Sequence, residues 1–287
     1  MPNFRGVWTP AKEKVMSVFF TAKALRTLRN TKKMVFLLTF YILPFTFHGQ
    51  EADTTAEKAE PAAVNTSSVD IFDSAAAIRY KKVDDLIFAM KRRNKKTPVL
   101  AKEITAPFNT EEEKVRALFD WITNNIAYDC AAYHSKTEVA FNFNYKSQEE
   151  LLKKIQLYYE KVAGLTLRNK KAVCEGYAVL FKEFCNENGI ECQLVEGRAN
   201  ENKDKIKKLR KRSSFSTNHT WNKVKVNGVW YYIDVTWASG YCDKKVTHFY
   251  KKFNPYYFLV PLDELYPTHA ENVKFTERRN NPVGTRE

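Results

Sequence analysis

Three residues in the second half of the chain have the types needed for nucleophilic attack on a carbonyl group: Cys174, His219 and Asp234. A cysteine thiol becomes a strong nucleophile when a histidine accepts its proton and a carboxylate orients that histidine. His219 and Asp234 flank two runs of alternating apolar residues that meet at Asn227-Gly228. Asn-Gly favours the left-handed conformations of a two-residue type I′ turn. We therefore predict a β-hairpin that carries the histidine and the carboxylate.

The turn determines which residues of this hairpin share a face. We expect it to close between Val226 and Val229. In that register Asp234 lies opposite Trp221, which is two residues from His219. His219 and Asp234 then project from the same face, one diagonal step apart, at roughly 7–8 Å between backbones. An imidazole and a carboxylate can span that gap to form a hydrogen bond.

The two faces of the hairpin differ in chemical character. The aliphatic face is expected to hold the core, through Val224, Val226, Val229, Ile233 and Val235. The other face is expected to look into a substrate cleft, through His219, Trp221, Tyr232 and Asp234.

Cys174 opens a stretch with helical periodicity that ends at Gly189. One face of that helix would carry Cys174, Tyr177, Ala178, Phe181, Phe184 and Cys185. The unpaired N–H groups and the positive dipole end of a helix N-terminus favour a thiolate. We assign Tyr177, one turn after the thiol, to the cleft as well. From these residues alone, a buried structural cysteine is as good an interpretation as a catalytic one.

The remaining periodicity predicts further elements. We expect helices over 70–93 and 149–162, a capping-box helix that begins after Thr110, and strands over 190–197 and 254–261. The basic stretch 200–216 is interpreted as a solvated excursion between strands, and the stretch after residue 261 as a loop or short helix. His248 and His269 have no partner at informative spacing, so both are interpreted as surface or structural residues.

The five cysteines have no CxxC spacing and no histidine at zinc-finger spacing, so no structural metal site is expected. An odd number leaves at least one free thiol, which suits a cysteine nucleophile. Cys185 and Cys192 are interpreted as buried apolar residues. Cys130 and Cys242 could pair, but nothing in their spacing supports it.

The N-terminal part of the chain has its own composition. Residues 1–50 hold eight Lys/Arg and one acidic residue, which is half of the net charge of +14, so the charge does not argue for nucleic-acid binding. The apolar run 34–47 is short for a membrane span and follows two lysines. We predict a signal peptide within 1–50, a linker over 51–69, a catalytic domain over 70–287 and export from the cytoplasm. Retention of 34–47 would instead give a cytoplasmic or membrane-anchored protein.

Three stretches of the chain resemble the transglutaminase-like superfamily, most of all its bacterial and kyphoscoliosis-peptidase-like members. They read VRALFDWITNNIAYD, AVCEGYAVLFKEFCNENGIECQLVEG and HTWNKVKVNGVWYYIDVTW. The family places a cysteine at a helix start, a histidine at a strand start and an aspartate in the next strand. VCEGYA, NHTWN and YYIDVTW stand in that order here, and NPYYFLVPLDELYPTHAE is similar to the family's final strand.

The resemblance implies an α+β fold with a papain-like core, in which an antiparallel sheet packs against the cysteine-bearing helix. It also implies an acyl-thioester on Cys174, with His219 moving the proton and Asp234 orienting His219. The acidic calcium cluster of cross-linking transglutaminases and the zinc CxxC pairs of peptide:N-glycanases are absent. We therefore expect no metal and no cofactor.

Three functions fit these residues. The first is a cysteine peptidase that hydrolyses protein or peptide amides, and the second is an acyltransferase or transamidase with the same mechanism. The third is a non-catalytic domain that binds proteins. In each case the expected partner is a protein or peptide, with no nucleic acid and no stable membrane anchor. The sequence leaves open the substrate, the second oxyanion donor and the oligomeric state.

Overall fold

The computed structural model describes residues 69–90, 96–135, 139, 141–212, 215–264 and 266–282. The predicted signal peptide with its apolar run 34–47 lies outside the described residues, as does the predicted linker apart from Val69, which begins the first helix. None of the helices in the described part has both the length and the apolar character that crossing a membrane requires.

Helix α1 (Val69–Ala89) contains the boundary between two compact units of the chain, which falls between Arg79 and Tyr80. Of the unit that ends at Arg79, only the first part of α1 is described. The other unit contains every element that follows. The helix predicted over 70–93 agrees with α1 to within one residue at its start.

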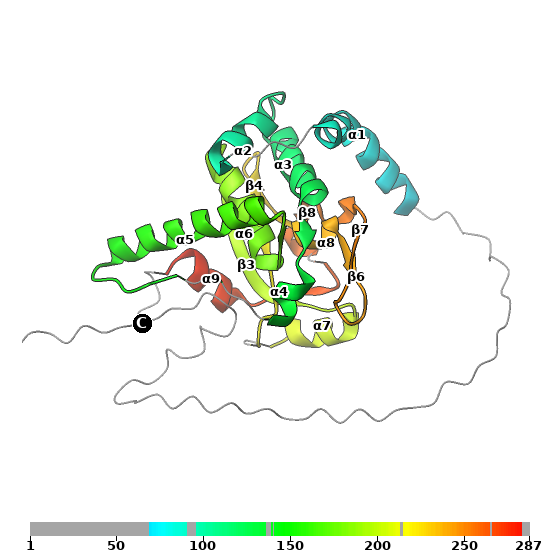
Figure 1. Ribbon diagram of the computed structural model, residues 1–287. Coiled ribbons are helices and arrows are strands. Elements are labelled where there is room, and N and C mark those ends of the chain that lie inside the picture. Colours follow the sequence, from blue (N-terminus) through cyan, green and yellow to red (C-terminus); the bar gives the residue numbers. More distant parts are fainter. Residues whose placement is uncertain are drawn as a thin grey trace, which may run out of the picture. The chain divides into compact units, whose positions relative to one another are not determined.

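The unit that begins at Tyr80 contains helices of very different lengths (Figure 1). They are α2 (Thr97–Thr105), α3 (Glu111–Asn125), α4 (Cys130–Ser135), α5 (Gln148–Asn169), α6 (Cys174–Glu187), α7 (Lys203–Arg210), α8 (Val235–Ser239) and α9 (Val273–Asn280). The capping box predicted at Thr110 is confirmed, because its side chain accepts from the Glu113 N–H and the Glu113 side chain accepts from the Thr110 N–H. Helix α5 continues seven residues beyond the predicted end at 162.

A five-stranded antiparallel sheet holds the functional part of the chain together. Its spatial order is β8 (Val260–Pro261), β5 (Val229–Ile233), β4 (His219–Val226), β3 (Cys192–Ala199) and β9 (His269–Glu271). Two small sheets accompany it: β1 (Ala127–Tyr128) pairs in parallel with β2 (Lys171–Ala172), and β6 (Gly240–Cys242) pairs with β7 (Phe249–Lys251).

The hairpin formed by β4 and β5 has the predicted register, with Val226 opposite Val229 and Asn222 opposite Ile233. Asn227 and Gly228 have φ values of 49° and 83°, the left-handed conformations that the tight turn needs.

Two predictions about the hairpin are wrong. Strand β5 ends at Ile233, and Val235 begins α8 instead of extending the strand. The aspartate between them is a strong helix N-cap residue, which explains why the backbone turns into a helix there. Val229, predicted in the core, lies at the turn with 52% of its surface exposed.

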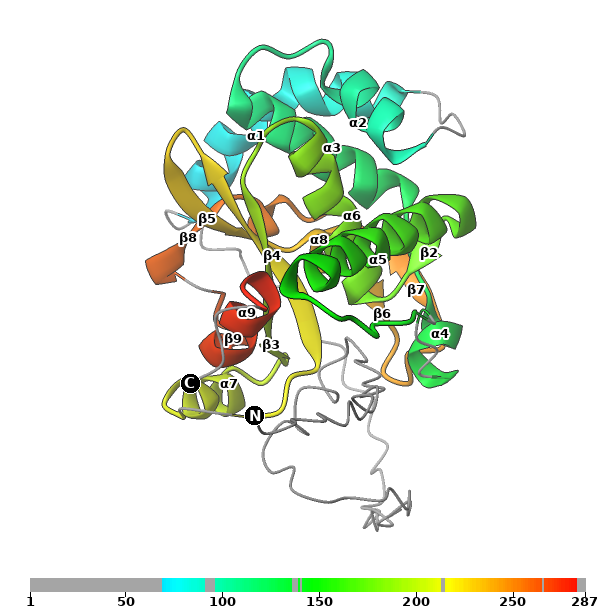
Figure 2. The same cartoon turned by 90° about the vertical axis from the view of Figure 1, so that its left-hand side faces the viewer.

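Helix α6 lies at the centre of the core. It packs against α2, α3 and α5 and against strands β3 and β4 (Figures 1 and 2). Its bounds agree with the prediction, since it starts at Cys174 and Gly189 follows it with φ 70°. The predicted apolar stripe is too narrow, because Val179 and Leu180 on the other side are fully buried too. A sheet packed against the cysteine-bearing helix confirms the predicted α+β fold class.

Three segments after β3 differ from the predictions. The basic stretch 200–216 contains helix α7, which the buried Ile206 anchors. The strand predicted over 254–261 is a 3₁₀ turn (Pro255–Tyr257) followed by the two residues of β8. The last strand is β9, in the stretch predicted as a loop or short helix. Strand β9 has three residues, too few to show the alternation by which a strand is recognised in a sequence.

Helix α9 completes the edge of the sheet. Strand β9 pairs with β3 only from Gly197 onward, so the preceding backbone groups of β3 need other partners. The Asn280 side chain accepts from the Leu194 N–H and donates to its carbonyl, at 3.1 and 2.7 Å. Thr276 accepts from the N–H of Glu196 at 3.0 Å. Polar side chains thereby cover an edge that would otherwise be open to pairing with another chain.

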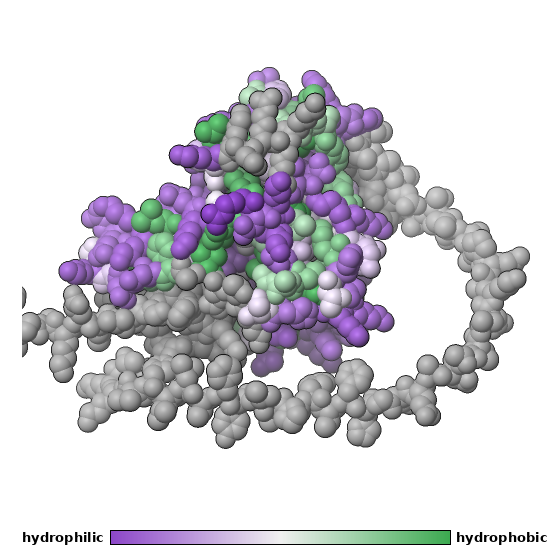
Figure 3. All heavy atoms as spheres, viewed as in Figure 1, coloured by the Kyte–Doolittle hydropathy of each residue, from purple (hydrophilic) through white to green (hydrophobic). Residues whose placement is uncertain are grey.

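The outer surface in the view of Figure 3 is mostly hydrophilic over α5 and α7, with smaller apolar areas between them. This agrees with the exposed lysines of α7, Lys203, Lys205, Lys207 and Lys208. The single arginine of α7 behaves differently, because the Arg210 guanidinium donates to the carbonyl of His269 at 2.9 Å. The basic helix is therefore held against β9.

Candidate active site

Cys174 occupies the first position of α6 and is half-buried. The preceding residue, Val173, has an extended backbone and provides no side-chain cap, so backbone N–H groups at this end of the helix stay available to an anion. Strand β2 leads into the helix and pairs with β1, which fixes the approach of the chain. Gly176 fits tightly in the first turn: a Cβ there would lie 2.4 Å from Cβ of Ala172.

His219 begins β4, and Asp234 directly follows β5. The Nε2 atom of His219 lies 2.7 Å from Oδ2 of Asp234, and both side chains are buried, with 7% and 0% of their surface exposed. The register predicted from the Asn-Gly turn thus brings these two side chains into contact. With Nε2 engaged by the carboxylate, Nδ1 is the ring nitrogen left to exchange a proton with a thiol.

Asp234 is held at both carboxylate oxygens. Its Oδ1 accepts hydrogen bonds from the backbone N–H groups of Thr236 and Trp237, at 2.9 and 3.0 Å. Burial alone would raise the pKa of Asp234, but the charge and hydrogen bonds of His219, and then of His269, outweigh it. The pKa of this carboxyl group consequently lies well below its ordinary value, so the group is ionised throughout the neutral range.

The His219 ring is coupled to its two neighbours. Burial would lower the pKa of His219, yet the Asp234 carboxylate and a hydrogen bond with Cys174 raise it to about 10. A protonated imidazole is therefore the stable form at neutral pH, and it would stabilise a thiolate beside it. The structure thus brings together the three residues that the sequence analysis selected.

His269 is the residue that the sequence analysis missed. Its Nε2 lies 3.0 Å from Oδ2 of Asp234, the same oxygen that bonds His219, and the side chain is fully buried. It is therefore no surface residue. Burial lowers its pKa, and its Nδ1 lies 2.9 Å from the Thr268 hydroxyl. A neutral ring that donates through Nε2 and accepts through Nδ1 satisfies both contacts.

The three residues assigned to the cleft are buried. Trp221, Tyr232 and Tyr177 have 1%, 5% and 0% of their surface exposed. Tyr177 donates its hydroxyl to the carbonyl of Ile126 at 2.9 Å, and Tyr232 lies 2.5 Å from a carboxylate oxygen of Glu271. A substrate would reach these side chains only after a rearrangement of the protein.

Trp221 contributes to the site as a support for the histidines. Its ring stacks on His219 with a centroid distance of 5.7 Å and meets His269 edge-on at 5.1 Å. Gly197 makes room for it, because a Cβ at this position would lie 2.4 Å from the indole ring. The aromatic contacts fix the plane of the His219 ring.

The described residues also contain a group of side chains that could bind one metal ion. It consists of His219, Asp234 and His269, whose potential ligand atoms lie within 4.8 Å of one another. The same atoms form the hydrogen bonds between the carboxylate and the two rings. A metal ion would require both Nε2 atoms to lose their hydrogens, so the arrangement is better matched to proton transfer.

The surroundings of Cys174 include Tyr128 on β1. Burial, and next the negative charge of a Cys174 thiolate, raise the pKa of the Tyr128 hydroxyl. Cys242 and Cys130 add smaller effects in the same direction. A neutral phenol beside the nucleophile can donate a hydrogen bond.

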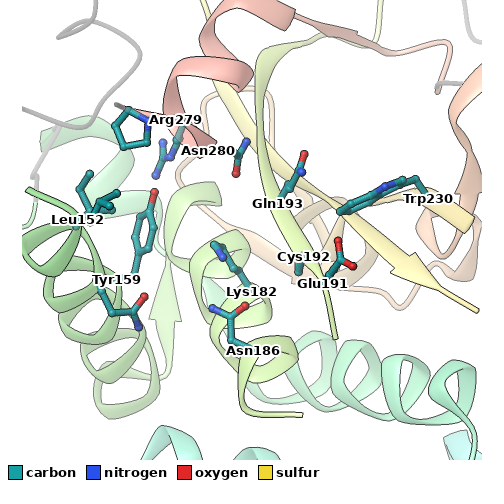
Figure 4. A pocket seen from close by; sticks show the side chains of 13 residues that line it. Leu152, Tyr159, Lys182, Asn186, Glu191, Cys192, Gln193, Trp230, Arg279 and Asn280 are labelled. Atoms are coloured by element: carbon teal, nitrogen blue, oxygen red, sulfur yellow. The ribbon is translucent and has the colours of Figure 1, made fainter. Parts of the chain in front are cut away.

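A pocket of about 450 Å³ lies elsewhere on the domain, between α5 and α6 on one side and β3 and α9 on the other (Figure 4). Its lining includes Tyr159, Lys182, Cys192, Trp230 and Arg279, and none of the three candidate catalytic residues.

Arg279 connects the wall of this pocket to the nucleophile helix. Its Nη2 lies 2.6 Å from a carboxylate oxygen of Glu175, the residue after Cys174.

Comparisons with known proteins place the domain in a family. Residues 98–235 match the model of the transglutaminase-like superfamily. Human kyphoscoliosis peptidase is 32% identical over 163 residues, which cover 56% of this chain and 21% of the human protein. Drosophila melanogaster hillarin is 26% identical over 167 residues, 56% of this chain and 17% of hillarin.

One solved structure of a TGase is 19% identical with a TM-score of 0.32, over 66% of this chain and 40% of that one. The matched part of the chain spans about a fifth of the length of kyphoscoliosis peptidase and of hillarin. The matched segment includes Cys174 and His219 and ends one residue after Asp234. The family match and the relatives lead to the same conclusion: residues 98–235 of this chain form a domain of the transglutaminase-like superfamily.

Proposed function

We propose that this protein is a cysteine hydrolase that cleaves amide bonds in proteins or peptides through a thioester on Cys174. The observation that carries the proposal is the buried contact of 2.7 Å between His219 and Asp234, next to a cysteine at a helix N-terminus. A buried, ionised carboxylate that holds a histidine beside a thiol is the arrangement that activates a nucleophile. The similarity to a relative named as a peptidase favours hydrolysis.

In the acylation step, the Cys174 thiolate, whose proton is held on Nδ1 of His219, attacks the carbonyl carbon of the substrate. The oxyanion that forms would accept hydrogen bonds from backbone N–H groups at the start of α6. The imidazolium then protonates the leaving amine, the C–N bond breaks, and the acyl group remains on sulfur as a thioester.

Deacylation uses the same residues in reverse. His219 removes a proton from a water molecule, the resulting hydroxide attacks the thioester, and the thiolate leaves with a carboxylic acid as the product. Asp234 remains ionised throughout and stabilises the imidazolium in both steps, which its lowered pKa allows.

Transamidation is the second candidate, because a primary amine could replace water in the second step without any change in the residues used. The half-buried position of Cys174 leaves the thioester accessible to a small amine as well as to water. The third candidate, a non-catalytic binding domain, would need no activated thiol.

Selective labelling tests whether Cys174 is activated. The protein is treated with limiting iodoacetamide near neutral pH and digested with trypsin. Cys174 then lies in peptide 172–182, and Cys185 with Cys192 in peptide 183–198. We expect modification of peptide 172–182 first, and at least about tenfold more slowly in His219→Ala. Equal labelling of all the cysteine peptides would contradict the proposal.

A peptide substrate then separates the two reactions. Mass spectrometry of an acylated product formed with and without an added primary amine shows whether water or the amine accepts the acyl group. A product carrying the amine, formed in preference to the acid, would establish transamidation in place of hydrolysis.

A further inference from the structure

Two cysteines that lie 112 residues apart in the sequence meet beside the candidate active site. Cys130 begins α4 and Cys242 ends β6, and their sulfur atoms are 3.9 Å apart. Both side chains are half-buried, so small reagents can reach them. Burial and the neighbouring Cys130 raise the pKa of Cys242 to about 12, which agrees with two sulfurs in direct contact.

Other contacts hold the two segments together, so the approach of the sulfurs does not depend on the cysteines alone. Nε2 of His134, on α4, lies 3.0 and 3.1 Å from the carbonyl oxygens of Lys245 and Val246, in the loop between β6 and β7. On β1, the Tyr128 ring packs against Phe249 of β7 at a centroid distance of 6.4 Å. These contacts fix α4 and the β6–β7 hairpin as neighbours.

We propose that Cys130 and Cys242 are a modification site, which a small-molecule disulfide converts into a disulfide bond between α4 and the β6–β7 hairpin. Closing the pair requires the sulfurs to move from 3.9 Å to the bonding distance of about 2.05 Å, a change within the range of side-chain rotation. The bond would close near the start of the nucleophile helix, since the N–H of Asp129, next to Cys130, donates to the carbonyl of Ala172 at 2.9 Å. This inference does not depend on the proposed hydrolase activity.

The chemistry is thiol–disulfide exchange with a reagent such as oxidised glutathione. One protein thiolate attacks the reagent's disulfide, forming a mixed disulfide and releasing one glutathione thiolate. The second protein thiolate attacks the sulfur of the mixed disulfide, forming the Cys130–Cys242 bond and releasing the second glutathione thiolate. The two released thiolates take up the two protons lost by the cysteines. The protein is oxidised by two electrons and the reagent is reduced by two.

The other cysteines have different surroundings. Cys185 and Cys192 are buried in the core, and burial followed by a hydrogen bond with Cys192 raises the pKa of Cys185 strongly. A thiol that is buried in the core is inaccessible to a disulfide reagent and therefore reacts slowly. Exchange should therefore select Cys130 and Cys242 over Cys185 and Cys192. Cys174 is as accessible as the pair and can react with the reagent too, which is why the test removes it.

The test uses the full chain with Cys174→Ala, treated with oxidised glutathione, capped with iodoacetamide and digested with trypsin without reduction. Cys130 lies in peptide 117–136 and Cys242 in peptide 226–244, whereas Cys185 and Cys192 share peptide 183–198. We expect a cross-linked species that joins 117–136 to 226–244 and disappears on reduction. Cys130→Ser and Cys242→Ser should each abolish it.

The matched control is the same oxidation carried out on the chain unfolded in urea. It should give several different disulfide bonds among the cysteines instead of one. A folded chain that yields no 117–136/226–244 species would overturn the proposal. So would a folded wild-type chain in which either peptide is joined to 172–182, which contains Cys174. Because the cross-link is measured in a variant that lacks the nucleophile, its failure would leave the hydrolase proposal untouched. Conversely, if iodoacetamide did not label Cys174 selectively, the hydrolase proposal would fail but the proposed Cys130–Cys242 disulfide would not be affected.

Discussion

The Nε2 atom of His269 lies 3.0 Å from the same carboxylate oxygen of Asp234 that accepts from His219. Two imidazoles therefore bond one oxygen, and they do so with opposite shifts in pKa. Coupling to Asp234 and Cys174 outweighs burial and raises the pKa of His219, whereas burial lowers the pKa of His269. The pair divides into a charged histidine that faces the thiol and a neutral histidine that helps keep the carboxylate ionised.

Replacing His269 tests whether this second hydrogen bond matters to the nucleophile. His269→Phe removes the donor, and we expect Cys174 to react with iodoacetamide roughly tenfold more slowly, since a hydrogen bond to a charged group contributes about 1.5–3 kcal/mol. His269→Gln is the matched control, because its amide can donate from nearly the same place, and it should restore most of the rate. Equal rates in both variants would show that His269 only fills space.

A pair of substitutions at Asp234 separates its charge from its role as a helix cap. Asp234→Asn keeps an oxygen for the N–H groups of Thr236 and Trp237 but loses the charge that holds His219. We expect the reaction at Cys174 to slow by about a hundredfold or more, with α8 intact.

Asp234→Ala should slow the reaction at Cys174 to the same extent. It should also lower the stability of the fold, because the side chain that caps α8 is missing. An N-cap aspartate contributes about 0.5–2 kcal/mol to stability. The difference in urea unfolding between the two variants measures that contribution. An Asn variant as fast as the wild type would remove Asp234 from the mechanism.

The central part of this site could be predicted because its pattern is local. Asn227-Gly228 sets the turn, the turn sets the register, and a period of two residues then puts His219 and Asp234 on one face. Cys174 was recognisable from the helical spacing that follows it. The helix that begins after Asp234 was also open to prediction, since aspartate is a strong N-cap residue.

The rest of the site depends on contacts between distant parts of the chain. His269 reaches Asp234 because the three-residue strand β9 pairs with β3, about seventy residues earlier. Cys130 and Cys242 meet across 112 residues. No periodicity within either segment encodes such pairings. The burial of Trp221 and Tyr232 likewise involves distant residues, since His269 meets the Trp221 ring and Tyr266 meets the Tyr232 ring.

The raised pKa of His219 makes a prediction about stability and pH. The folded protein holds the His219 proton up to about pH 10, whereas the unfolded chain releases it near pH 6.5. The contribution of this group is therefore complete below about pH 6.5 and is lost as pH rises toward 10. We expect the free energy of unfolding to fall by up to a few kcal/mol over this interval, beyond the change seen in His219→Gln.

Urea unfolding of both proteins at several values of pH measures this difference, and the variant corrects for tyrosines and lysines that titrate in the same range. Parallel curves for the wild type and His219→Gln would show that His219 titrates alike in the folded and unfolded chain.

Arg279 is expected to stabilise the start of the nucleophile helix through buried charge. Its guanidinium donates to the carboxylates of Glu196 and Glu175, and only 4% of the Arg279 surface is exposed. Arg279→Gln would leave Glu196 buried without its cation, at a cost of about 3–5 kcal/mol near neutral pH. Arg278→Gln is the matched control next to it in α9, and we expect a change within about 0.5 kcal/mol.

The pH dependence of Arg279→Gln distinguishes lost charge pairing from lost packing. Burial already raises the pKa of Glu196, and Arg279 opposes that rise. Without the arginine, the pKa of Glu196 in the folded state should lie further above its value in the unfolded chain. Stability gained by protonation is then present at low pH and lost as pH rises, so the deficit of the variant should shrink between about pH 7 and pH 5. A deficit that stays constant over this interval would assign the effect to packing of the arginine side chain.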